Sequence, residues 1–397
     1  MSSSANLSPK KPSRALDILA LEPWYAGSHR GFLDGLIAHS AHHIHPITLP
    51  GRFWKWRQTG SGLVLAQRVR DQAEAGLTPP NLIFASDFLH LPDFLALTRR
   101  QWPNVPAILY FHENQLTYPL EEGHQLDPAY PQANLSGAAV ADQVWFNSAH
   151  HQRVFFEGLE RLLKACPDFA PHYLAEEIGQ KSRVLPLGVD LDSLTPHFEP
   201  RRNRQGPLTV LWNHRWEHDK NPEAFFRTLF DLSDAGREFR LIVLGQAFRQ
   251  TPKIFTEAQT RLTRHIDHWG YAESRADYAR LLGQADVVVS VARHDFFGVS
   301  VVEAMHAGCL PLLAHRLNYP DLIPQEAHPR CLLERDEDLT ERLAELIQNP
   351  QRVRDAAAPD GGPTAWAAAY EWAQRATDFD AAFSAAFSAA FEAHPRP

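Results

Sequence analysis

The chain has 397 residues, of which 44% are hydrophobic, and its formal net charge is −8 at pH 7. A chain of this length exceeds one ordinary hydrophobic core, so we expect two domains of roughly 150–200 residues each. The acidic balance excludes general coating of nucleic acid, which depends on neutralising many phosphates, although a local basic footprint is compatible with it.

The N-terminal segment, residues 1–14, is polar and basic and is not followed by a cleavable apolar region, so we predict a flexible tail. No apolar run in the chain is long enough to span a bilayer. Cys166, Cys309 and Cys331 are widely separated and lack the paired spacing of a zinc site or a disulfide framework. These features predict a soluble, cytoplasmic protein with no membrane contact.

The first half of the chain alternates short apolar runs with helical patterns, which is typical of a parallel sheet covered by helices. We therefore predict a Rossmann-like domain over residues 15–195. Its expected strands are Leu16–Leu21, Ile44–Leu49, Leu82–Ala85, Ala107–Phe111, Gln143–Phe146 and Val184–Leu187.

A segment rich in proline, glycine and charge, Gly188–Pro207, interrupts this alternation. We place a linker at residues 196–207 and a second doubly wound, Rossmann-like domain at residues 208–363. Two such α/β domains facing each other would leave a central cleft. The expected strands of the second domain are Leu208–Trp212, Arg240–Leu244, His265–Trp269, Asp286–Val291 and Leu310–Ala314.

The C-terminal segment, residues 364–397, reads as an alanine-rich helix in which phenylalanine recurs every four residues from Phe379 to Phe391. On a helix of 3.6 residues per turn this spacing gives a slanted apolar stripe. Packing along a core is favoured over a partner or membrane surface, because the helix lacks the basic polar face of a membrane binder.

The most informative stretch, Ser290–Pro311, follows a buried strand and leads through Gly298 into a helical pattern that carries Glu303. Backbone N–H groups and acidic side chains therefore meet at the carboxyl end of a strand, where α/β sheets bind nucleotides. A carboxylate can accept paired hydrogen bonds from a ribose diol, and a glycine lets the backbone approach a phosphate. We expect donor contacts from Asp295, Phe297, Gly298, Val299, Ser300 and Glu303.

Two cations, Arg215 and Lys220, follow the first strand of the second domain, in a loop that opens a helix near Asn221 and Pro222. Cations beside a helix N-terminus suit a diphosphate, whose negative charge is spread over several oxygens. A solvated cationic loop is the alternative interpretation.

Polar residues also cluster in the first domain. Gly27 and Ser28 lie in a tight turn between a strand and a helix, where a small residue lets donor and acceptor approach the backbone closely, so we expect them to contact the donor; a plain turn is an equally good interpretation. His112, Glu113, Asn114 and Gln115 come directly after a strand, so they can orient hydroxyl groups.

Aromatic and basic residues alternate in a further segment, which consists of Arg52, Phe53, Trp54, Lys55, Trp56 and Arg57. Such a segment can stack unpaired bases and neutralise phosphates, although an amphipathic structural loop would have the same composition. Four nearby histidines, His39, His42, His43 and His45, have no acidic or cysteine partners, so we predict surface histidines and no metal site.

The acidic pair Asp295 and Glu303 resembles the E-x7-E motif of retaining GT-B glycosyltransferases, and Arg215 and Lys220 resemble their R-x4-K motif. The resemblance implies that the cations hold the donor diphosphate and stabilise the leaving group, that Glu303 binds the ribose, and that Asp295 and His112 contact the transferred hexose. In this chain the first acid is Asp rather than Glu, which shortens its reach. The resemblance also implies that the C-terminal helix returns to the first domain.

Five strings, E-P-W-Y-A-G-S-H, L-P-G-R-F-W-K-W-R, Y-F-H-E-N-Q-L-T-Y-P, V-W-F-N-S and R-H-D-F-F-G-V-S-V-V-E-A, resemble the tRNA-queuosine α-mannosyltransferase family over residues 22–304. The resemblance implies transfer of mannose from GDP-mannose, with retention, to the cyclopentene hydroxyl of queuosine in a tRNA anticodon. It implies that residues 52, 54–57 and 112–115 bind the acceptor.

Two alternatives remain at this point: the same fold acting on a small-molecule, lipid or protein acceptor, and a non-catalytic protein that binds nucleotide sugar or RNA. A D-x-D-like metal motif is not evident, so we expect no metal and no cofactor besides the donor substrate. No obligate protein partner is indicated.

Overall fold

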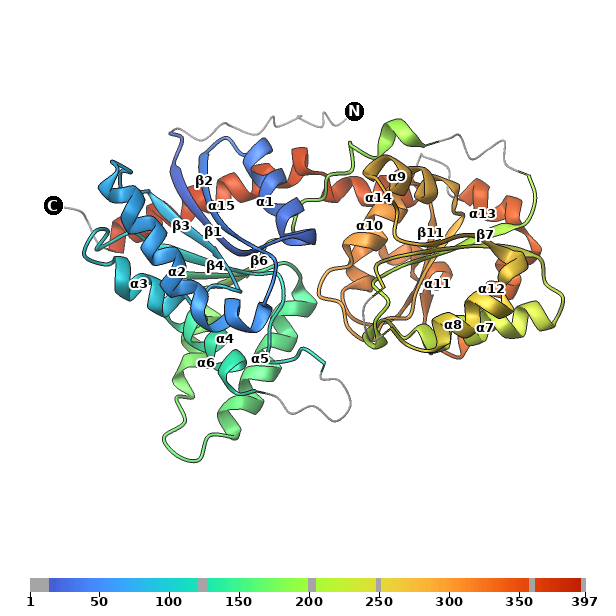
Figure 1. Ribbon diagram of the computed structural model, residues 1–397, viewed down its shortest axis with the longest axis horizontal. Coiled ribbons are helices and arrows are strands. Elements are labelled where there is room, and N and C mark those ends of the chain that lie inside the picture. Colours follow the sequence, from blue (N-terminus) through green and yellow to red (C-terminus); the bar gives the residue numbers. More distant parts are fainter. Residues whose placement is uncertain (1–13, 120–126, 199–204, 248–250, 357–360, 394–397) are drawn as a thin grey trace, which may run out of the picture. The chain divides into compact units, whose positions relative to one another are not determined.

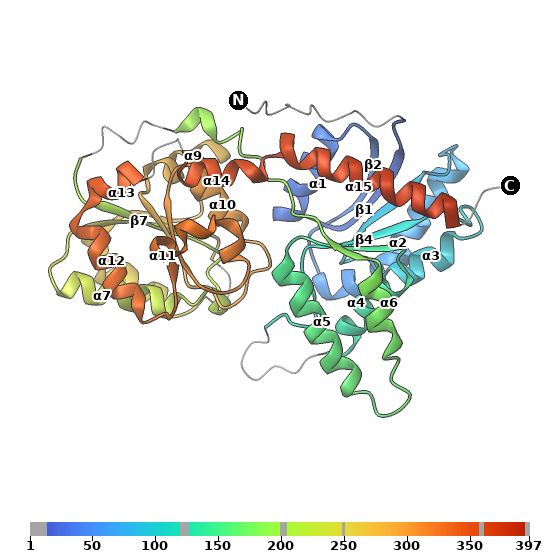
Figure 2. The ribbon, with the colours of Figure 1, turned by 180° about the vertical axis from the view of Figure 1, so that it is seen from behind.

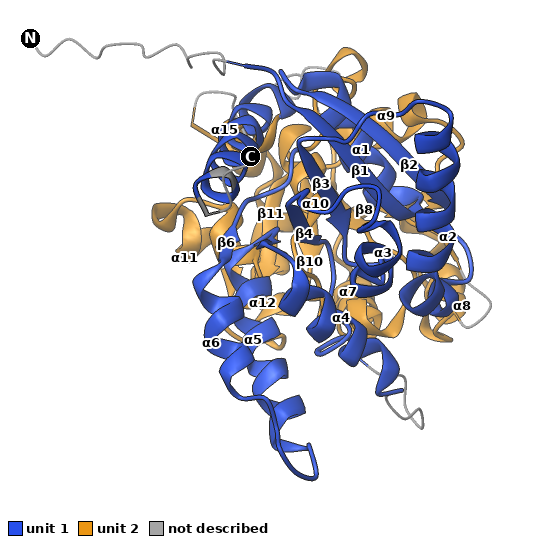
Figure 3. Cartoon of the chain, turned by 90° about the vertical axis from the view of Figure 1, so that its left-hand side faces the viewer, with its two compact units in different colours: residues 1–188, 372–397 blue, residues 189–371 orange. Residues whose placement is uncertain are grey.

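The structure is a computed structural model that describes residues 14–119, 127–198, 205–247, 251–356 and 361–393 (Figure 1). The chain divides into two compact units (Figure 3): unit 1 contains residues 1–188 and 372–397, and unit 2 contains residues 189–371. Over the described residues, each unit has a six-stranded parallel sheet with helices on both faces. This arrangement confirms the predicted α/β class with two doubly wound domains.

Unit 1 has the strand order β2-β1-β3-β4-β5-β6 in its described part, so the direction of winding reverses between β1 and β3. Ligands bind at the carboxyl ends of strands at such a reversal. The elements of unit 1 are β1 (Asp17–Tyr25), α1 (Gly27–His39), β2 (His43–Pro50), α2 (Trp54–Glu74), β3 (Leu82–Ser86), α3 (Leu91–Thr98), β4 (Ala107–Phe111), α4 (Ala129–Val140), β5 (Gln143–Phe146), α5 (Ala149–Lys164), α6 (Tyr173–Gln180), β6 (Ser182–Val184) and α15 (Trp372–Ala393).

The central strands β3 and β4 of the unit 1 sheet are buried along their whole length, and their alternating side chains separate two helical layers. In β4, Leu109 and Phe111 belong to the core shared with helices α2 to α6. Tyr110, between them, faces the opposite layer, where its ring centroid lies 4.9 Å from that of Phe32 in α1 and 5.8 Å from that of Phe379 in α15.

Helix α15 completes this second layer and lies along α1 (Figure 2). Phe379 and Phe383 are fully buried, and the ring of Phe383 lies 5.2 Å from that of Phe84 and 5.3 Å from that of Trp145. The slanted phenylalanine stripe is therefore part of the core of unit 1, as the core-packing interpretation predicts. The side chain of Phe391 is not among those that the structure describes.

Unit 2 has the strand order β12-β11-β10-β7-β8-β9 in its described part, with the reversal between β7 and β10. Helices α7, α8 and α12 cover one face of this sheet, and α9, α10 and α14 cover the other (Figure 1). The elements are η1 (Thr195–His197), β7 (Leu208–Asn213), η3 (His218–Lys220), α7 (Pro222–Asp234), β8 (Phe239–Leu244), α8 (Ile254–Arg261), η4 (Thr263–His265), β9 (Ile266–Gly270), α9 (Arg275–Gln284), β10 (Val287–Ser290), α10 (Val299–His306), β11 (Leu310–Ala314), η5 (Tyr319–Leu322), η6 (Gln325–Ala327), α11 (His328–Cys331), β12 (Leu332–Leu333), α12 (Asp338–Gln348), α13 (Pro350–Ala356), α14 (Pro363–Ala367) and η7 (Ala368–Tyr370).

Three strands differ most from the sequence-based expectation. β1, expected at Leu16–Leu21, continues to Tyr25, because its pairing with β2 extends across an irregularity to Tyr25 opposite Pro50. β6 ends at Val184, whereas Val184–Leu187 was expected; Leu185 still donates its N–H to Phe146 O, but Pro186 has no N–H to continue the ladder. β12, Leu332–Leu333, is too short to produce a sequence pattern.

The unit boundaries fall at residues 188/189 and 371/372, so residues 189–195 and 364–371 lie in unit 2 rather than in the segments expected for them. His42 is not a surface histidine: it is buried, its Nδ1 accepts from Leu16 N–H, and its Nε2 donates to Asp380 O on α15. Within the described residues, no helix is long and apolar enough to cross a membrane.

Candidate functional site

In unit 2, the residues predicted to bind the donor lie in segments that follow β7 and β10, the two strands at the reversal. Arg215 and Lys220 follow β7. Asp295, the α10 N-terminus and Glu303 follow β10. Because parallel strands end at the same edge of a sheet, the fold brings the two sequence motifs to one place.

Lys220 is buried, and its ammonium group is fixed by two neighbours. Its Nζ donates to His294 O at 2.6 Å and lies 3.1 Å from Asp219 Oδ2. Burial alone would raise the pKa of Asp295, but Lys220, His214 and His294 outweigh it and hold that pKa below its usual value. Lys220 therefore keeps Asp295 ionised at neutral pH.

Arg215 differs from Lys220 because it is exposed, and its Nη2 lies 3.1 Å from Glu217 Oε2. Helix α7 begins at Pro222, with Asn221 in a left-handed conformation (φ 55°) at the N-cap, so the predicted helix start is confirmed. The buried lysine is held in place, whereas the arginine reaches solvent.

Helix α10 begins after Gly298, whose φ of 99° lies in the left-handed region that favours glycine. A Cβ on Gly298 would lie 3.1 Å from Leu322 Cδ1. Before it, Phe297 is buried and donates its N–H to Asp295 Oδ1 at 3.3 Å. Val299 and Ser300, half-buried, form the first turn of the helix.

Glu303 is buried on α10, and both of its carboxylate oxygens accept hydrogen bonds. Arg275 Nη1 donates to Oε1 at 2.7 Å, and the Tyr278 hydroxyl donates to Oε2 at 2.6 Å. Each oxygen keeps a second lone pair for a ligand. Arg275 and Tyr278 were not predicted as site residues; their spacing of three positions in an expected helix is the signal that could have found them.

Asn213, the last residue of β7, connects these groups. Its Nδ2 donates to the Tyr278 hydroxyl at 2.8 Å and to Ser300 O at 3.1 Å. Neighbouring His214 is buried, and its pKa is lowered to about 4 by burial and by Lys220. His214 is therefore neutral at physiological pH.

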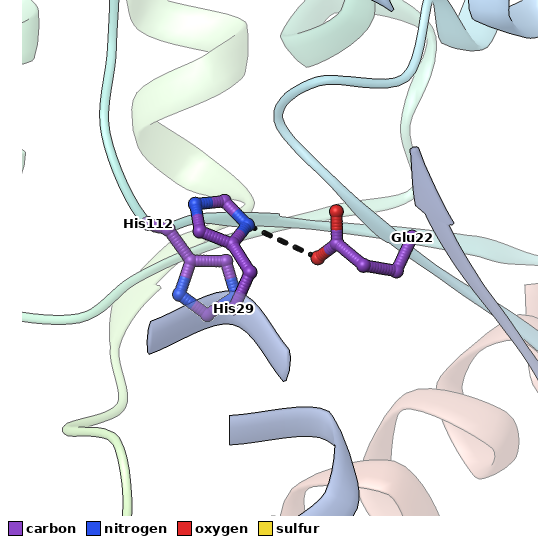
Figure 4. Close-up of side chains that lie close together, drawn as sticks. All are labelled: Glu22, His29 and His112. Carbon is purple, nitrogen blue, oxygen red and sulfur yellow. Dashed lines mark hydrogen bonds and ion pairs between the residues drawn. The ribbon is translucent and has the colours of Figure 1, made fainter. Parts of the chain in front are cut away.

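In unit 1, the edge at the β1/β3 reversal carries a second cluster, formed by Glu22, His29 and His112 (Figure 4). His29, in the first turn of α1, has its Nδ1 3.1 Å from Glu22 Oε2. His112 follows β4, and its ring centroid lies 4.3 Å from that of His29. Glu22 and His29 were not predicted, although both stand in the quoted string E-P-W-Y-A-G-S-H; their spacing of seven residues across a strand end gave no separate signal.

The two histidines of this cluster have opposite pKa shifts. Burial alone would lower the pKa of His29, but Glu22 raises it to about 9. Burial, together with His29 and His151, lowers the pKa of His112 well below its usual value. At neutral pH His29 is therefore charged and His112 neutral.

The remaining predicted residues near His112 differ in accessibility. Asn114 is fully buried, and its Oδ1 accepts from Leu116 N–H and from Thr117, so its side chain supports the loop. Gln115 is buried, and its Nε2 donates to Glu113 Oε1 at 3.0 Å. Gly27 and Ser28 are exposed at the start of α1, and Gly27 has a positive φ of 52°.

The aromatic–basic patch, defined here as Arg52, Phe53, Trp54, Lys55 and Trp56, is exposed at the N-terminus of α2. Phe53 is 72% exposed, Trp54 38% and Trp56 51%, a strong departure from the usual burial of large aromatic side chains. Arg57 is buried instead, and its guanidinium donates to Pro50 O.

Helix α2, which begins at Trp54, also contacts a residue that packs against the histidine cluster. Ser61 of α2 donates its hydroxyl to Phe88 O at 2.9 Å, and the Phe88 ring lies 5.4 Å from the His29 ring.

The fold is similar to that of sucrose-phosphate synthase from Thermosynechococcus elongatus, with a TM-score of 0.70 and 16% identity over 94% of this chain and 100% of that chain. Residues 195–358 match the family described as glycosyl transferases group 1. Two doubly wound domains with a cation and carboxylate site at the reversal of the second sheet define a GT-B glycosyltransferase.

Residues 17–189 match the family described as tRNA-queuosine alpha-mannosyltransferase N-terminal. The chain is 32% identical over 348 residues to the tRNA-queuosine alpha-mannosyltransferase of Drosophila melanogaster, a match that covers 85% of this chain and 88% of the relative. The chain belongs to the tRNA-queuosine α-mannosyltransferase family. A shorter match, 27% identical over 45% of this chain and 47% of the relative, is to a GDP-mannose-dependent alpha-(1-6)-phosphatidylinositol dimannoside mannosyltransferase of Mycobacterium tuberculosis.

Proposed function

We propose that this glycosyltransferase transfers mannose from GDP-mannose, with retention of anomeric configuration, to the cyclopentene hydroxyl of queuosine in a tRNA anticodon. The acceptor is supported by the Drosophila relative and by the family match over the first unit. GDP-mannose is supported by the printed name of the mycobacterial relative. We place the reaction in the cytoplasm, with queuosine-containing tRNA and the nucleotide sugar as the molecular partners.

The observation that carries the donor half of this proposal is the buried Lys220 beside an ionised Asp295 at the reversal of the second sheet. As the sugar–phosphate bond breaks, negative charge develops on the diphosphate, and a preorganised cation acts on it in the transition state. Lys220 and Arg215 would hold that charge, and the N-terminus of α10 would face a phosphate. Glu303, oriented by Arg275 and Tyr278, would bind the ribose diol.

Each unit supplies a candidate side chain for contact with the transferred sugar. Asp295 supplies a carboxylate for sugar hydroxyls, and His112 supplies a neutral imidazole. Gly27 and Ser28 would let the substrates approach the α1 N-terminus closely. The acceptor hydroxyl would attack the anomeric carbon from the face that the diphosphate leaves, which retains the configuration, and the hydroxyl proton would pass to the leaving diphosphate as the sugar–phosphate bond breaks.

The aromatic–basic patch would bind the tRNA. Exposed Trp54 and Trp56 can stack on unpaired bases, and Arg52 and Lys55 can contact phosphates. Glu113 and Gln115 would contact the acceptor nucleoside beside His112. Because Arg57 and Asn114 are buried, we give them only a supporting role in this surface.

Substitution of the patch tests the acceptor. Trp56→Ala should weaken tRNA binding roughly 5- to 150-fold, since stacking of one base contributes about 1–3 kcal/mol. Lys55→Ala should reduce the slope of log affinity against log salt concentration by about one, as expected for the loss of one phosphate contact. Lys253→Ala, an exposed lysine of unit 2, is the control. Equal affinities in all three variants would contradict an RNA-binding role.

Transfer to a lipid is the alternative raised by the mycobacterial relative, whose name specifies a phosphatidylinositol dimannoside. Ribonuclease treatment of the acceptor preparation separates the two cases. Mannose incorporation that survives ribonuclease favours the lipid. Incorporation that disappears favours tRNA, and digestion of the mannosylated nucleoside with an α-specific mannosidase then tests retention.

A further inference from the structure

The cluster of Glu22, His29 and His112 is more organised than contact with a sugar hydroxyl requires (Figure 4). The carboxylate of Glu22 is fixed on both oxygens: Oε1 accepts from Trp24 N–H at 2.7 Å and from the Ser86 hydroxyl at 2.9 Å, and Oε2 binds His29. Glu22 is 3% and His29 5% exposed. A carboxylate held in this way restricts the His29 ring to the orientation in which its Nδ1 faces Glu22 Oε2.

His112 lies against the pair formed by Glu22 and His29, which we call the dyad. Its backbone is anchored, since its N–H donates to Asp87 Oδ1 at 2.9 Å and its carbonyl accepts from Asn147 Nδ2 at 2.9 Å. Neither ring nitrogen has a hydrogen-bond partner among the described residues, and the ring lines a small cavity together with Glu22, Ser86 and Phe32. A neutral imidazole there offers one acceptor nitrogen.

We propose that Glu22 and His29 are positioning residues for His112: the carboxylate fixes a charged imidazole beside it, so that His112 stays neutral and presents a ring nitrogen that accepts a hydrogen bond from a substrate hydroxyl. The substrate class, a hydroxylated sugar or acceptor, rests on the proposed function. The charged dyad itself does not depend on that function.

The charged and titratable groups around the two rings come from several elements. Glu22 (β1), Asp87 (after β3) and Glu113 (after β4) raise the pKa of His29, whereas His151 (α5) acts with His29 to lower the pKa of His112. Tyr110 (β4) packs 4.8 Å from the His112 ring; burial raises its pKa well above the usual value, so it stays neutral.

Asp87 is the remaining carboxyl of the cluster, and burial raises its pKa. Its Oδ2 is buried without a hydrogen-bond partner in the part of the chain that the structure describes. Because His29 lowers the pKa of Asp87, the charge of the dyad also favours the ionised form of this carboxyl.

A divalent metal ion is the competing interpretation, since one ligand atom from each of Glu22, His29 and His112 lies within 4.8 Å of the others. The hydrogen bond between Glu22 and His29 accounts for the closest pair of these atoms without a metal. A metal would use the lone pairs of both imidazoles, so it is incompatible with a protonated His29.

The direct test is ring NMR of the wild-type protein as a function of pH, with the two resonances assigned from His29→Gln and His112→Gln. We expect His29 to titrate near pH 9 and His112 to show no titration down to pH 6. Both rings titrating near pH 6.5, or one equivalent of a divalent metal bound by the purified protein and lost in Glu22→Gln, would overturn the proposal.

The second test is the pH dependence of turnover in Glu22→Gln. Removing the carboxylate lowers the pKa of His29, and loss of the His29 charge lets the pKa of His112 rise, so His112 protonates at a higher pH than in wild type. The ratio of kcat to wild type should therefore be close to one at pH 8 and should fall by about tenfold or more as the pH is lowered toward 5.5, which corresponds to loss of one hydrogen-bond acceptor. His43→Gln, an exposed histidine, should match wild type throughout.

A loss that is the same at every pH would show a merely structural role and overturn the proposal. The separate effects on KM for donor and for tRNA identify which substrate supplies the hydroxyl. The NMR titration needs no substrate, so an unexpected titration would contradict the charged dyad alone. The expected titration in a protein that does not transfer mannose would contradict the proposed function alone.

Discussion

Replacement of Lys220 by Met should lower both the stability and the turnover of the enzyme, and the effect on stability should depend on pH. The Lys220 side chain is 9% exposed and lies 3.1 Å from Asp219, whose side chain is 11% exposed. Removing one member of a buried ion pair leaves an uncompensated charge and costs about 3–5 kcal/mol of unfolding free energy. The free energy of unfolding in urea at pH 7 measures this cost.

The pH dependence follows from Asp295. Because its folded pKa lies below the unfolded value of 3.8, it contributes stability above pH 3.8 that is lost as the pH falls through the folded pKa. Without Lys220 the folded pKa rises, so this contribution shrinks. The destabilisation by Lys220→Met should therefore be largest at neutral pH and smaller near pH 4.

Loss of the cation should lower kcat about 100- to 1000-fold, the range found when one group that stabilises transition-state charge is removed. Lys220→Arg, which keeps the charge, should retain more stability than Lys220→Met, and Lys253→Met, an exposed lysine of unit 2, is the matched control. Unchanged turnover and an unchanged unfolding midpoint in Lys220→Met would refute the reasoning.

Two further substitutions test the donor site and the packing of unit 1. Tyr278→Phe removes the hydroxyl that donates to Glu303, so GDP affinity measured by calorimetry should fall about tenfold; an unchanged affinity would contradict the ribose assignment. Gly35→Ala places a Cβ 1.9 Å from Trp372 Nε1 and should lower the free energy of unfolding by about 1–3 kcal/mol or more. Gly31→Ala, on the same helix with open space around the new methyl group, should instead stabilise by about 0.5–1 kcal/mol, and equal effects of the two would refute the packing argument.

The sequence predicted the architecture well because buried parallel strands are short, continuous apolar runs. Ala107–Phe111, Gln143–Phe146 and Leu310–Ala314 coincide with strands β4, β5 and β11. The exceptions have local causes: Pro186 ends β6 early, and the two residues of β12 carry no periodicity.

The sequence could predict residues of the candidate site only where they stand in short linear motifs. Arg215, Lys220, Asp295 and Glu303 stand in short spacings that the fold places on one sheet edge. The partners of these residues come from other elements: Arg275 lies 28 positions from the carboxylate that it binds. Side-chain partners that far apart are set by tertiary structure rather than by local spacing.

Burial separates residues that look alike in the sequence. Trp56 and Arg57 are neighbours in one alternating string, yet Trp56 is 51% exposed and Arg57 8%. The difference arises because Trp56 and Arg57 lie in the first turn of α2, where successive residues point about 100° apart around the helix axis.

The measurement that tests the central claim most directly is incubation of the purified protein with GDP-mannose and total tRNA that contains queuosine, followed by mass spectrometry of the nucleosides. We predict a queuosine nucleoside heavier by one hexose, formed with GDP-mannose and formed about 100- to 1000-fold more slowly with Lys220→Met. Consumption of GDP-mannose with no mass change in queuosine would agree with glycosyltransferase activity but would contradict queuosine as the acceptor. An unmodified nucleoside and an intact donor would contradict both parts of the proposed reaction.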